Sequence, residues 1–329
     1  MKKMNYQEFK NEVMANIKDY LSEEYRDYDM KVQTIKKSSC EYEGLMIGPK
    51  DRHMSVIPAL NLNSAYEQYE EGMPFDEVMD KLADIRMNAS LPGFNKEDMF
   101  DYAKIKDRIF PRLINTSANT DYLADKPHRE IEDLSLIYAV RVSEDSQGFA
   151  EAVITDDLAD MWGVDGQELH DRAMENIAER PPVFQNIENV LFGETEDLEI
   201  EDVDPENYRI PYFILTNQQK TKGAVMAVNP KTMDRITAHL GDVYVIPSSV
   251  DETLIVPKSA VDDVQPLIDM VKQVNANEVR PEDQLSNNVY EYSAETHTLK
   301  IAGSVQAQEE STQEHPASDE AQNGPDLAL

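Results

Sequence analysis

The sequence predicts an α+β fold, in which a mixed, largely antiparallel sheet or set of sheets packs against helices and a disordered acidic tail follows. Three observations predict it. Apolar residues recur at helical spacing in several segments, β-type runs come as adjacent pairs between those segments, and residues 303–329 show no periodicity. Adjacent strands can be joined by hairpins, whereas parallel strands need long crossovers, so the pairs favour an antiparallel layer.

The first 110 residues are expected to form an N-terminal subdomain of helices and short strands. Residues 5–21 carry an apolar stripe at spacings of three and four, which predicts an amphipathic helix. Two further helices are expected, one capped by Ser64 and ended by Gly72, the other opened by Pro74. Asn95 is expected to cap one more. The strands expected here are Met30–Ile35, Gly44–Ile47 and Ser55–Leu62.

Residues 111–302 are expected to form a second α+β domain that contains two units of strand, turn, strand and capped helix. The first unit comprises Asp133–Val142, Phe149–Ile154 and a helix after Thr155. The second comprises Ile210–Thr216, Gly223–Val228 and a helix after Asn229–Pro230. Beyond them we expect strands at Val243–Ile246 and Leu254–Val256, a helix through Val264–Val274 and a hairpin of Val289–Tyr292 and Leu299–Ala302.

The charge of the chain is strongly negative and limits its partners. The formal net charge is −33, from 64 acidic and 31 basic residues. Such a surface repels phosphate backbones, so direct binding to nucleic acid or to an anionic membrane is not expected. Eight of the acids fall in Glu194–Glu206, which predicts a solvated, mobile acidic loop. The single cysteine, Cys40, and the lack of a signal peptide or long apolar run predict a cytoplasmic protein.

The usual cofactor and metal motifs are missing from the sequence. The 12 glycines form no G-x-G-x-x-G or Walker A loop, so we expect no nucleotide cofactor. The six histidines and one cysteine have no metal-ligand spacing, and the acidic run lacks the glycine and spacing of an EF-hand, so we expect no metal site.

Two groups of polar residues are the candidate binding residues. Ser248, Ser249, Asp251 and Glu252 occupy a turn between two expected strands, a location that often carries function. Serine and aspartate are also ordinary turn formers, and no histidine base can be assigned from the sequence. The second group consists of asparagines that follow apolar runs, where they either line a groove or terminate strands: Asn115, Asn119 and Asn217.

The sequence resembles the bacterial domain-of-unknown-function family 5688 over most of residues 5–302. The resemblance rests on an ordered set of short segments: Leu113–Asn115, Asp133–Leu134, Leu215–Asn217, Gly223–Ala224, Ile246–Ser249, Met270–Val271, Val274–Asn275, Leu285–Ser286 and Val289–Tyr292. It implies an accessory or mobile-element gene of gut-type anaerobic bacteria, with no established activity. A histidine often stands in the family at the position of Asp251, so a Ser/His mechanism there would not be general.

These observations favour a non-enzymatic protein-interaction module with a protein partner, of unknown oligomeric state. Whether the chain is an enzyme is uncertain, and the lack of catalytic motifs argues against it. Two alternatives stay open. One is an acidic decoy that mimics DNA and occupies a DNA-binding protein, which the net charge of −33 suggests. The other is a hydrolase that uses the Ser248–Ser249 turn.

Overall fold

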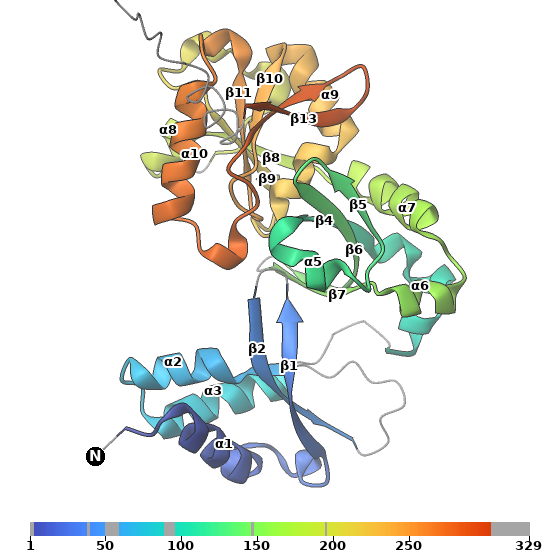
Figure 1. The fold of residues 1–329 in the computed structure, drawn as a ribbon, viewed down its shortest axis with the longest axis vertical. Coiled ribbons are helices and arrows are strands. Elements are labelled where there is room, and N and C mark those ends of the chain that lie inside the picture. The colour runs from blue at the N-terminus through green and yellow to red at the C-terminus, as the bar shows by residue number, and fades with distance from the viewer. Residues whose placement is uncertain are drawn as a thin grey trace, which may run out of the picture.

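The computed structural model describes residues 3–37, 40–49, 59–88, 96–145, 148–194 and 196–303. Within these ranges the chain forms helices and three antiparallel sheets (Figure 1), which confirms the predicted fold class. The predicted tail lies outside the described residues from position 304 onward, as do Asn95 and the first half of the predicted strand Ser55–Leu62.

The N-terminal part packs three helices against a three-stranded sheet and has a core of its own. The predicted first helix is α1 (Tyr6–Tyr20), which begins at a capping box of Asn5 and Glu8 and buries the stripe of Phe9, Val13 and Ile17. Asn61 caps the next helix in place of the predicted Ser64, because the helix begins two residues before that serine. The other elements are η1 (Glu23–Tyr25), β1 (Asp29–Lys37), β2 (Cys40–Gly48), β3 (Ala59–Asn61), α2 (Leu62–Glu70) and α3 (Phe75–Asn88).

This core, which runs from Phe9 to Ala83, shares no residue with the larger core, which extends from Met99 to Leu299. Met99, Ile105 and Ile109 already belong to the larger core. The division of the chain near residue 110 and the domain extents stay predictions.

A four-stranded sheet is built around the long strand β6 (Leu134–Asp145). Strand β4 (Ile109–Asn115) pairs along one side of β6, and β5 (His128–Ile131) and β7 (Gly148–Val153) pair with its first and second halves. The first part of β6 is a nearly continuous apolar run, and it is fully buried from Leu134 to Val140. The strand therefore lies inside the molecule, with only its end reaching the surface.

A six-stranded sheet forms the rest of the larger body. Its order is β13-β12-β10-β11-β9-β8, and every neighbouring pair is antiparallel. The predicted closing hairpin is confirmed as its β12–β13 end. The strands are β8 (Pro182–Asn186), β9 (Phe213–Asn217), β10 (Val243–Ile246), β11 (Thr253–Pro257), β12 (Val289–Ser293) and β13 (Thr298–Gly303).

Helices cover these two sheets and fill the space between them. The α-helices are α4 (Tyr102–Ile105), α5 (Thr120–Leu123), α6 (Asp156–Trp162), α7 (Gly166–Ala178), α8 (Ile187–Leu191), α9 (Pro230–Leu240) and α10 (Gln265–Asn277). The 3-10 helices are η2 (Lys96–Phe100), η3 (Lys106–Arg108), η4 (Ser117–Asn119), η5 (Ile200–Asp202), η6 (Pro205–Asn207), η7 (Gly223–Val228), η8 (Lys258–Ala260) and η9 (Pro281–Asp283). The predicted caps Thr155 and Asn229 are confirmed, since each accepts a hydrogen bond from the first turn of its helix.

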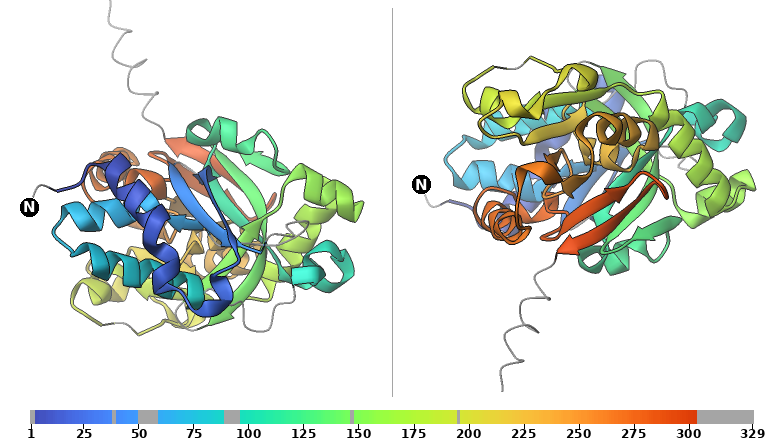
Figure 2. Two further views of the ribbon diagram at one scale, coloured as in Figure 1. Left: turned by 90° about the horizontal axis from the view of Figure 1, so that it is seen from below. Right: turned by 90° about the horizontal axis from the view of Figure 1, so that it is seen from above.

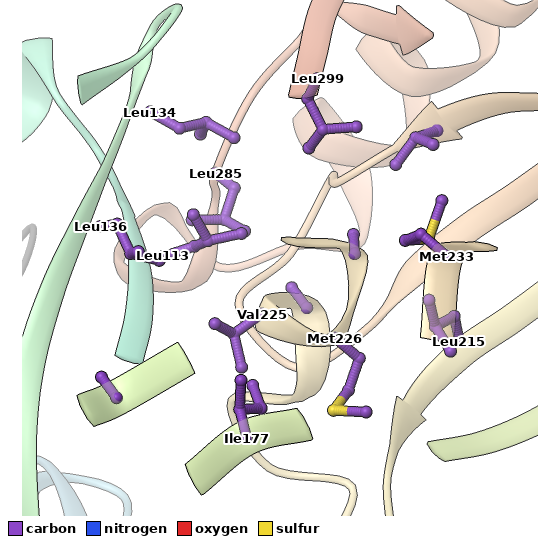
Figure 3. Close-up of a cluster of buried hydrophobic side chains, with 14 of the residues drawn as sticks. Leu113, Leu134, Leu136, Ile177, Leu215, Val225, Met226, Met233, Leu285 and Leu299 are labelled. Atoms are coloured by element: carbon purple, nitrogen blue, oxygen red, sulfur yellow. The ribbon is translucent and has the colours of Figure 1, made fainter. Parts of the chain in front are cut away.

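The larger core joins both sheets through η7. Figure 3 places Val225 and Met226 of η7 between Leu113 and Leu136 of the four-stranded sheet and Leu215 of the six-stranded sheet. Because one continuous apolar cluster spans these elements, the two sheets form one packed body.

The second predicted strand-turn-strand-helix unit is wrong in one element. Gly223–Val228 forms the 3-10 helix η7, whereas the first unit has β6, β7 and α6 as predicted. The main-chain N–H groups of Gly223 and Ala224 donate to the carbonyls of Asp251 and Val250, so the segment is tied to the turn before β11. Small residues allow this close approach, and their apolar character alone resembled a buried strand.

The predicted acidic loop, Glu194–Glu206, is attached to the body over its second half. Ile200 and Val203 are buried in the larger core, and the guanidinium of Arg235 binds the Glu201 carboxylate with N–O distances of 2.7 and 2.8 Å. The apolar residues interspersed among the acids therefore pack inward while the carboxylates face solvent. The sequence predicted that this loop is mobile, and the burial of Ile200 and Val203 argues against mobility for residues 200–203.

Among the described residues, no helix is both long enough and apolar enough to cross a membrane.

Candidate functional site

The predicted serine turn connects β10 to β11 and is held by main-chain contacts. The carbonyl of Ser248 accepts a hydrogen bond from the N–H of Leu285 at 3.0 Å. The hydroxyl of Ser249 accepts one from the N–H of Asp251 at 3.2 Å, which is a local turn contact. The described histidines form hydrogen bonds with other groups, and none of them is hydrogen-bonded to Ser248 or Ser249. The turn therefore has the contacts of a packed connection.

The three predicted asparagines also bind main-chain groups. Asn115 donates from Nδ2 to the carbonyl of Leu285 at 2.7 Å, and Asn119 donates to the carbonyl of Asn115 at the same distance. Asn217 donates to the carbonyl of Thr221 at 2.7 Å and closes the turn after β9. Each side chain thus stabilises a strand end or turn.

The structure brings these predicted residues together at two hydrogen-bonded contacts between distant segments. Leu285 links Asn115 to Ser248 through the hydrogen bonds described above. At the second contact the carbonyl of Asp251 accepts a hydrogen bond from the hydroxyl of Thr216 at 2.6 Å, next to Asn217. Glu252 is exposed beside it. Asn217 also lines a small pocket considered below.

A larger groove lies between the two sheets of the main body. Its volume is about 580 Å³, within the range of ligand-binding clefts. One wall is β5 with Glu132, and the other is the β12–β13 hairpin, which lies beside the four-stranded sheet (Figures 1 and 2). The floor is apolar and consists of side chains from β6, α7, η7, α9 and β13: Leu136, Met174, Ala227, Val228, Pro230 and Leu299.

Both walls of this groove are edge strands. Among the described residues β5 pairs only with β6, and β13 pairs only with β12. An edge strand keeps a row of main-chain N–H and C=O groups that no neighbouring strand binds. The turns that begin and end these strands are strained, since Glu132 and His297 have positive φ values of 56° and 53°. The groove thus combines an apolar floor with unpaired strand edges.

Polar side chains at the rim add fixed donors and acceptors. The hydroxyl of Tyr292 lies 3.1 Å from both Asp234 Oδ1 and His297 Nδ1. Burial and the nearby Asp234 raise the pKa of Tyr292, so its hydroxyl is neutral at physiological pH. His170 Nδ1 lies 3.2 Å from the hydroxyl of Tyr138, and burial lowers the pKa of His170. These groups can orient a bound segment. Neither His170 nor His297 is hydrogen-bonded to a serine, threonine or cysteine among the described residues, so neither has the partner of a nucleophile-activating base.

Comparison with known proteins identifies the family. A family model described as "Family of unknown function (DUF5688)" matches residues 6–294. The chain belongs to this family. No curated protein and no solved structure matches the chain. The resemblance predicted from the short ordered segments is confirmed, whereas the bacterial, mobile-element setting stays a prediction.

The sequence did not indicate the groove of this DUF5688 protein. Its walls come from segments about 170 positions apart, Arg129–Glu132 and Thr296–Lys300, and its floor comes from four further elements. The predicted closing hairpin is present and ends the described part of the chain. No local pattern indicates which two strands become edges that face one groove.

Proposed function

We propose that this DUF5688 protein is a non-enzymatic interaction module that binds an extended peptide segment of a protein partner in the groove between β5 and β13. The observation that carries the proposal is the pair of unpaired strand edges above an apolar floor. An extended segment forms main-chain hydrogen bonds with an edge strand and points alternate side chains toward one face. The single cysteine supports the further proposal that this binding takes place in the cytoplasm.

The character of β5 favours a short peptide over a second copy of the chain. The strand has four residues, and its first three, His128, Arg129 and Glu130, are exposed and polar or charged. Short, charged edge strands disfavour pairing between large sheets. A flexible segment can enter the groove and reach the floor without bringing a second body of net charge −33 against the first.

Peptide selection on the full-length protein tests this proposal. We expect a phage-displayed library of random twelve-residue peptides to yield sequences with alternating apolar residues. Hydrogen exchange with a selected synthetic peptide is expected to slow at residues 128–131 and 298–303, because new main-chain hydrogen bonds form there.

Two methionine variants locate the binding site. Met174→Lys puts a charge on the groove floor and is expected to weaken the selected peptide about tenfold or more, since the ammonium must be desolvated. Met161→Lys on α6 is the control, because Met161 is 56% exposed and lies outside the groove lining. Equal affinities of both variants, or slower exchange at neither edge, would refute the proposed site.

The two other functions predicted from the sequence have less support. The Ser248 and Ser249 contacts are those of a packed turn, and a hydrolase there would need a base from elsewhere. The DNA-mimic hypothesis rests on net charge alone, and two residues of the most acidic segment, Ile200 and Val203, are buried in the core. Both stay predictions.

A further inference from the structure

Four cationic side chains line a small pocket that shares the elements η7 and α7 with the peptide groove but none of its lining residues. The pocket is lined by Arg112 of β4, Arg141 of β6, Arg180 after α7 and Lys222 before η7, with Glu151 of β7 as its one carboxylate among the described lining residues. This is unexpected in a chain with twice as many acids as bases. These residues are far apart in the sequence, so only the fold brings them together.

Two carboxylates are each shared between two of these cations. Glu151 Oε1 lies 2.9 Å from Arg112 Nη1 and 2.5 Å from Lys222 Nζ. Glu144 lies 3.1 Å from Arg141 and binds both terminal nitrogens of Arg180 at 3.1 and 2.9 Å. Because one carboxylate carries a single negative charge, two cations that share it are only partly neutralised.

Aromatic rings hold the guanidinium groups in place. The guanidinium carbon of Arg141 lies 4.1 Å from the ring centroids of both Phe110 and Phe149, so the group contacts both rings. Arg180 lies 4.8 Å from the Phe110 ring. Rings of this kind fix planar guanidinium groups and leave their edges available for hydrogen bonds.

Two arginine donors in this pocket have no acceptor. The Nε atoms of Arg112 and Arg141 are buried and make no hydrogen bond among the described residues. The two side chains are only 13% and 12% exposed. Burial lowers the pKa of Arg141, with the neighbouring Arg180 acting in the same direction and Glu144 against it. Unsatisfied charged donors of this kind are costly unless another group binds them.

We propose that the pocket binds a small oxyanion, a phosphate or carboxylate group, through Arg112, Arg141, Arg180 and Lys222. Planar guanidinium groups match the oxygen atoms of both anions. The free volume is about 30 Å³, above the ~10–15 Å³ that one water-sized group needs, so the pocket has room for a small group only. The strongly acidic surface elsewhere repels anions and disfavours their binding outside such a cluster of cations.

Anion titration of the full-length protein tests the site, with the arginine Nε–H signals observed by NMR. Sodium phosphate and sodium acetate are titrated separately at constant ionic strength. We expect a saturable shift of the Arg112 and Arg141 Nε–H signals with at least one anion, assigned from the Arg112→Gln and Arg141→Gln spectra. A response to phosphate alone identifies a phosphoryl group, a response to acetate alone a carboxylate, and a response to both a general oxyanion site.

A matched pair of arginine variants separates binding from a structural role. Arg180→Gln is expected to weaken the anion roughly 10-fold or more, as expected for the loss of one charge-assisted hydrogen bond. Arg235→Gln is the control, because Arg235 also binds a glutamate through two nitrogens and its exposure of 39% matches the 40% of Arg180. No saturable shift with either anion, or equal weakening by both variants, would overturn the proposal.

Discussion

The hydroxyl of Tyr290 is a residue-scale contact that joins the two sheets of the main body. It donates to Asp133, which lies between β5 and β6, and it lies 3.0 Å from Ser286 Oγ. The Asp133 carboxylate also accepts from Ser286 at 2.8 Å and Asn288 at 3.0 Å. Burial and the hydrogen bond to Asp133 raise the pKa of Tyr290, so it remains a donor. A carboxylate at the sheet junction is thus bound by three donors.

Tyr290→Phe is expected to lower the free energy of unfolding by about 1–3 kcal/mol, because the half-buried carboxylate loses a donor. Urea denaturation measures this. Tyr244→Phe on β10 is the control, since the Tyr244 hydroxyl makes no hydrogen bond among the described residues while its ring contacts Lys258. The control should change stability by no more than ~0.5 kcal/mol. Equal losses in both variants would show that the Asp133 contact contributes nothing.

His170 gives a pH dependence at the residue scale. Burial lowers its pKa, with Arg129 acting in the same direction and Asp171 against it. The unfolded chain, with a histidine pKa of about 6.5, then binds a proton more readily than the folded chain. The contribution of neutral His170 to the free energy of unfolding is therefore fully present above about pH 6.5, and it is lost as the pH falls toward the pKa of His170 in the folded chain. His170→Gln is expected to reduce the fall in stability between about pH 7.5 and 5.5, as measured by urea denaturation, and the exposed His128→Gln is its control. An unchanged slope in His170→Gln would contradict the assignment.

At the scale of the element, η7 depends on glycine at its first residue. A Cβ added to Gly223 would lie 2.1 Å from Thr216 Oγ1, 2.6 Å from the Asp251 carbonyl oxygen and 2.7 Å from the Asn217 nitrogen. Two of these atoms are main chain and cannot rotate away. Gly223→Ala is expected to destabilise the fold by at least ~1–3 kcal/mol, the usual range for overpacking.

Gly166→Ala at the start of α7 is the control, since a Cβ there meets nothing within 4 Å. Alanine is the better helix former, so this variant is expected to be neutral or slightly stabilising. Thermal unfolding of the two variants measures the contrast. A Gly223→Ala protein as stable as the wild type would mean that the η7 joint relaxes easily.

Elements with a strong periodic signal could be predicted, and elements determined by packing could not. The stripe of α1 and the apolar run of β6 identify their structures because burial acts along one face or the whole strand. The segment Gly223–Val228 has small and apolar residues in either case, and its 3-10 conformation depends on the distant carbonyls of Val250 and Asp251. The candidate serine and asparagine residues lie at turns and strand ends as predicted, where they contact main-chain groups, and ligand binding by them stays a prediction.

The groove and the cationic pocket belong to the scale of the whole molecule. Each is assembled from four or more elements, and η7 and α7 contribute to both. Arg112, Arg141, Arg180 and Lys222 are far apart in the sequence, and the count of 64 acids against 31 bases gives no sign that they gather. Only the pairing of β4, β6 and β7 and the placement of η7 bring them together, so sequence patterns could not predict the pocket.

The net charge of −33 predicts a salt dependence of the whole fold. Like charges repel in the compact state, and the Debye length shortens from about 30 Å at 0.01 M salt to about 8 Å at 0.15 M. Screening also weakens ion pairs such as Arg235–Glu201, but exposed pairs contribute only ~0–1 kcal/mol each. With acids outnumbering bases about two to one, repulsion should dominate, and the midpoint of thermal unfolding should rise with sodium chloride.

Calorimetry between about 0.01 and 0.15 M sodium chloride measures this rise, and a falling midpoint would mean that ion pairs outweigh the repulsion. Sodium phosphate at matched ionic strength separates screening from specific binding. A ligand that binds the folded state adds stability according to its concentration and affinity. Any extra rise with phosphate should therefore disappear in Arg180→Gln while the rise with chloride remains, because screening depends on the charge of the whole surface and not on one arginine.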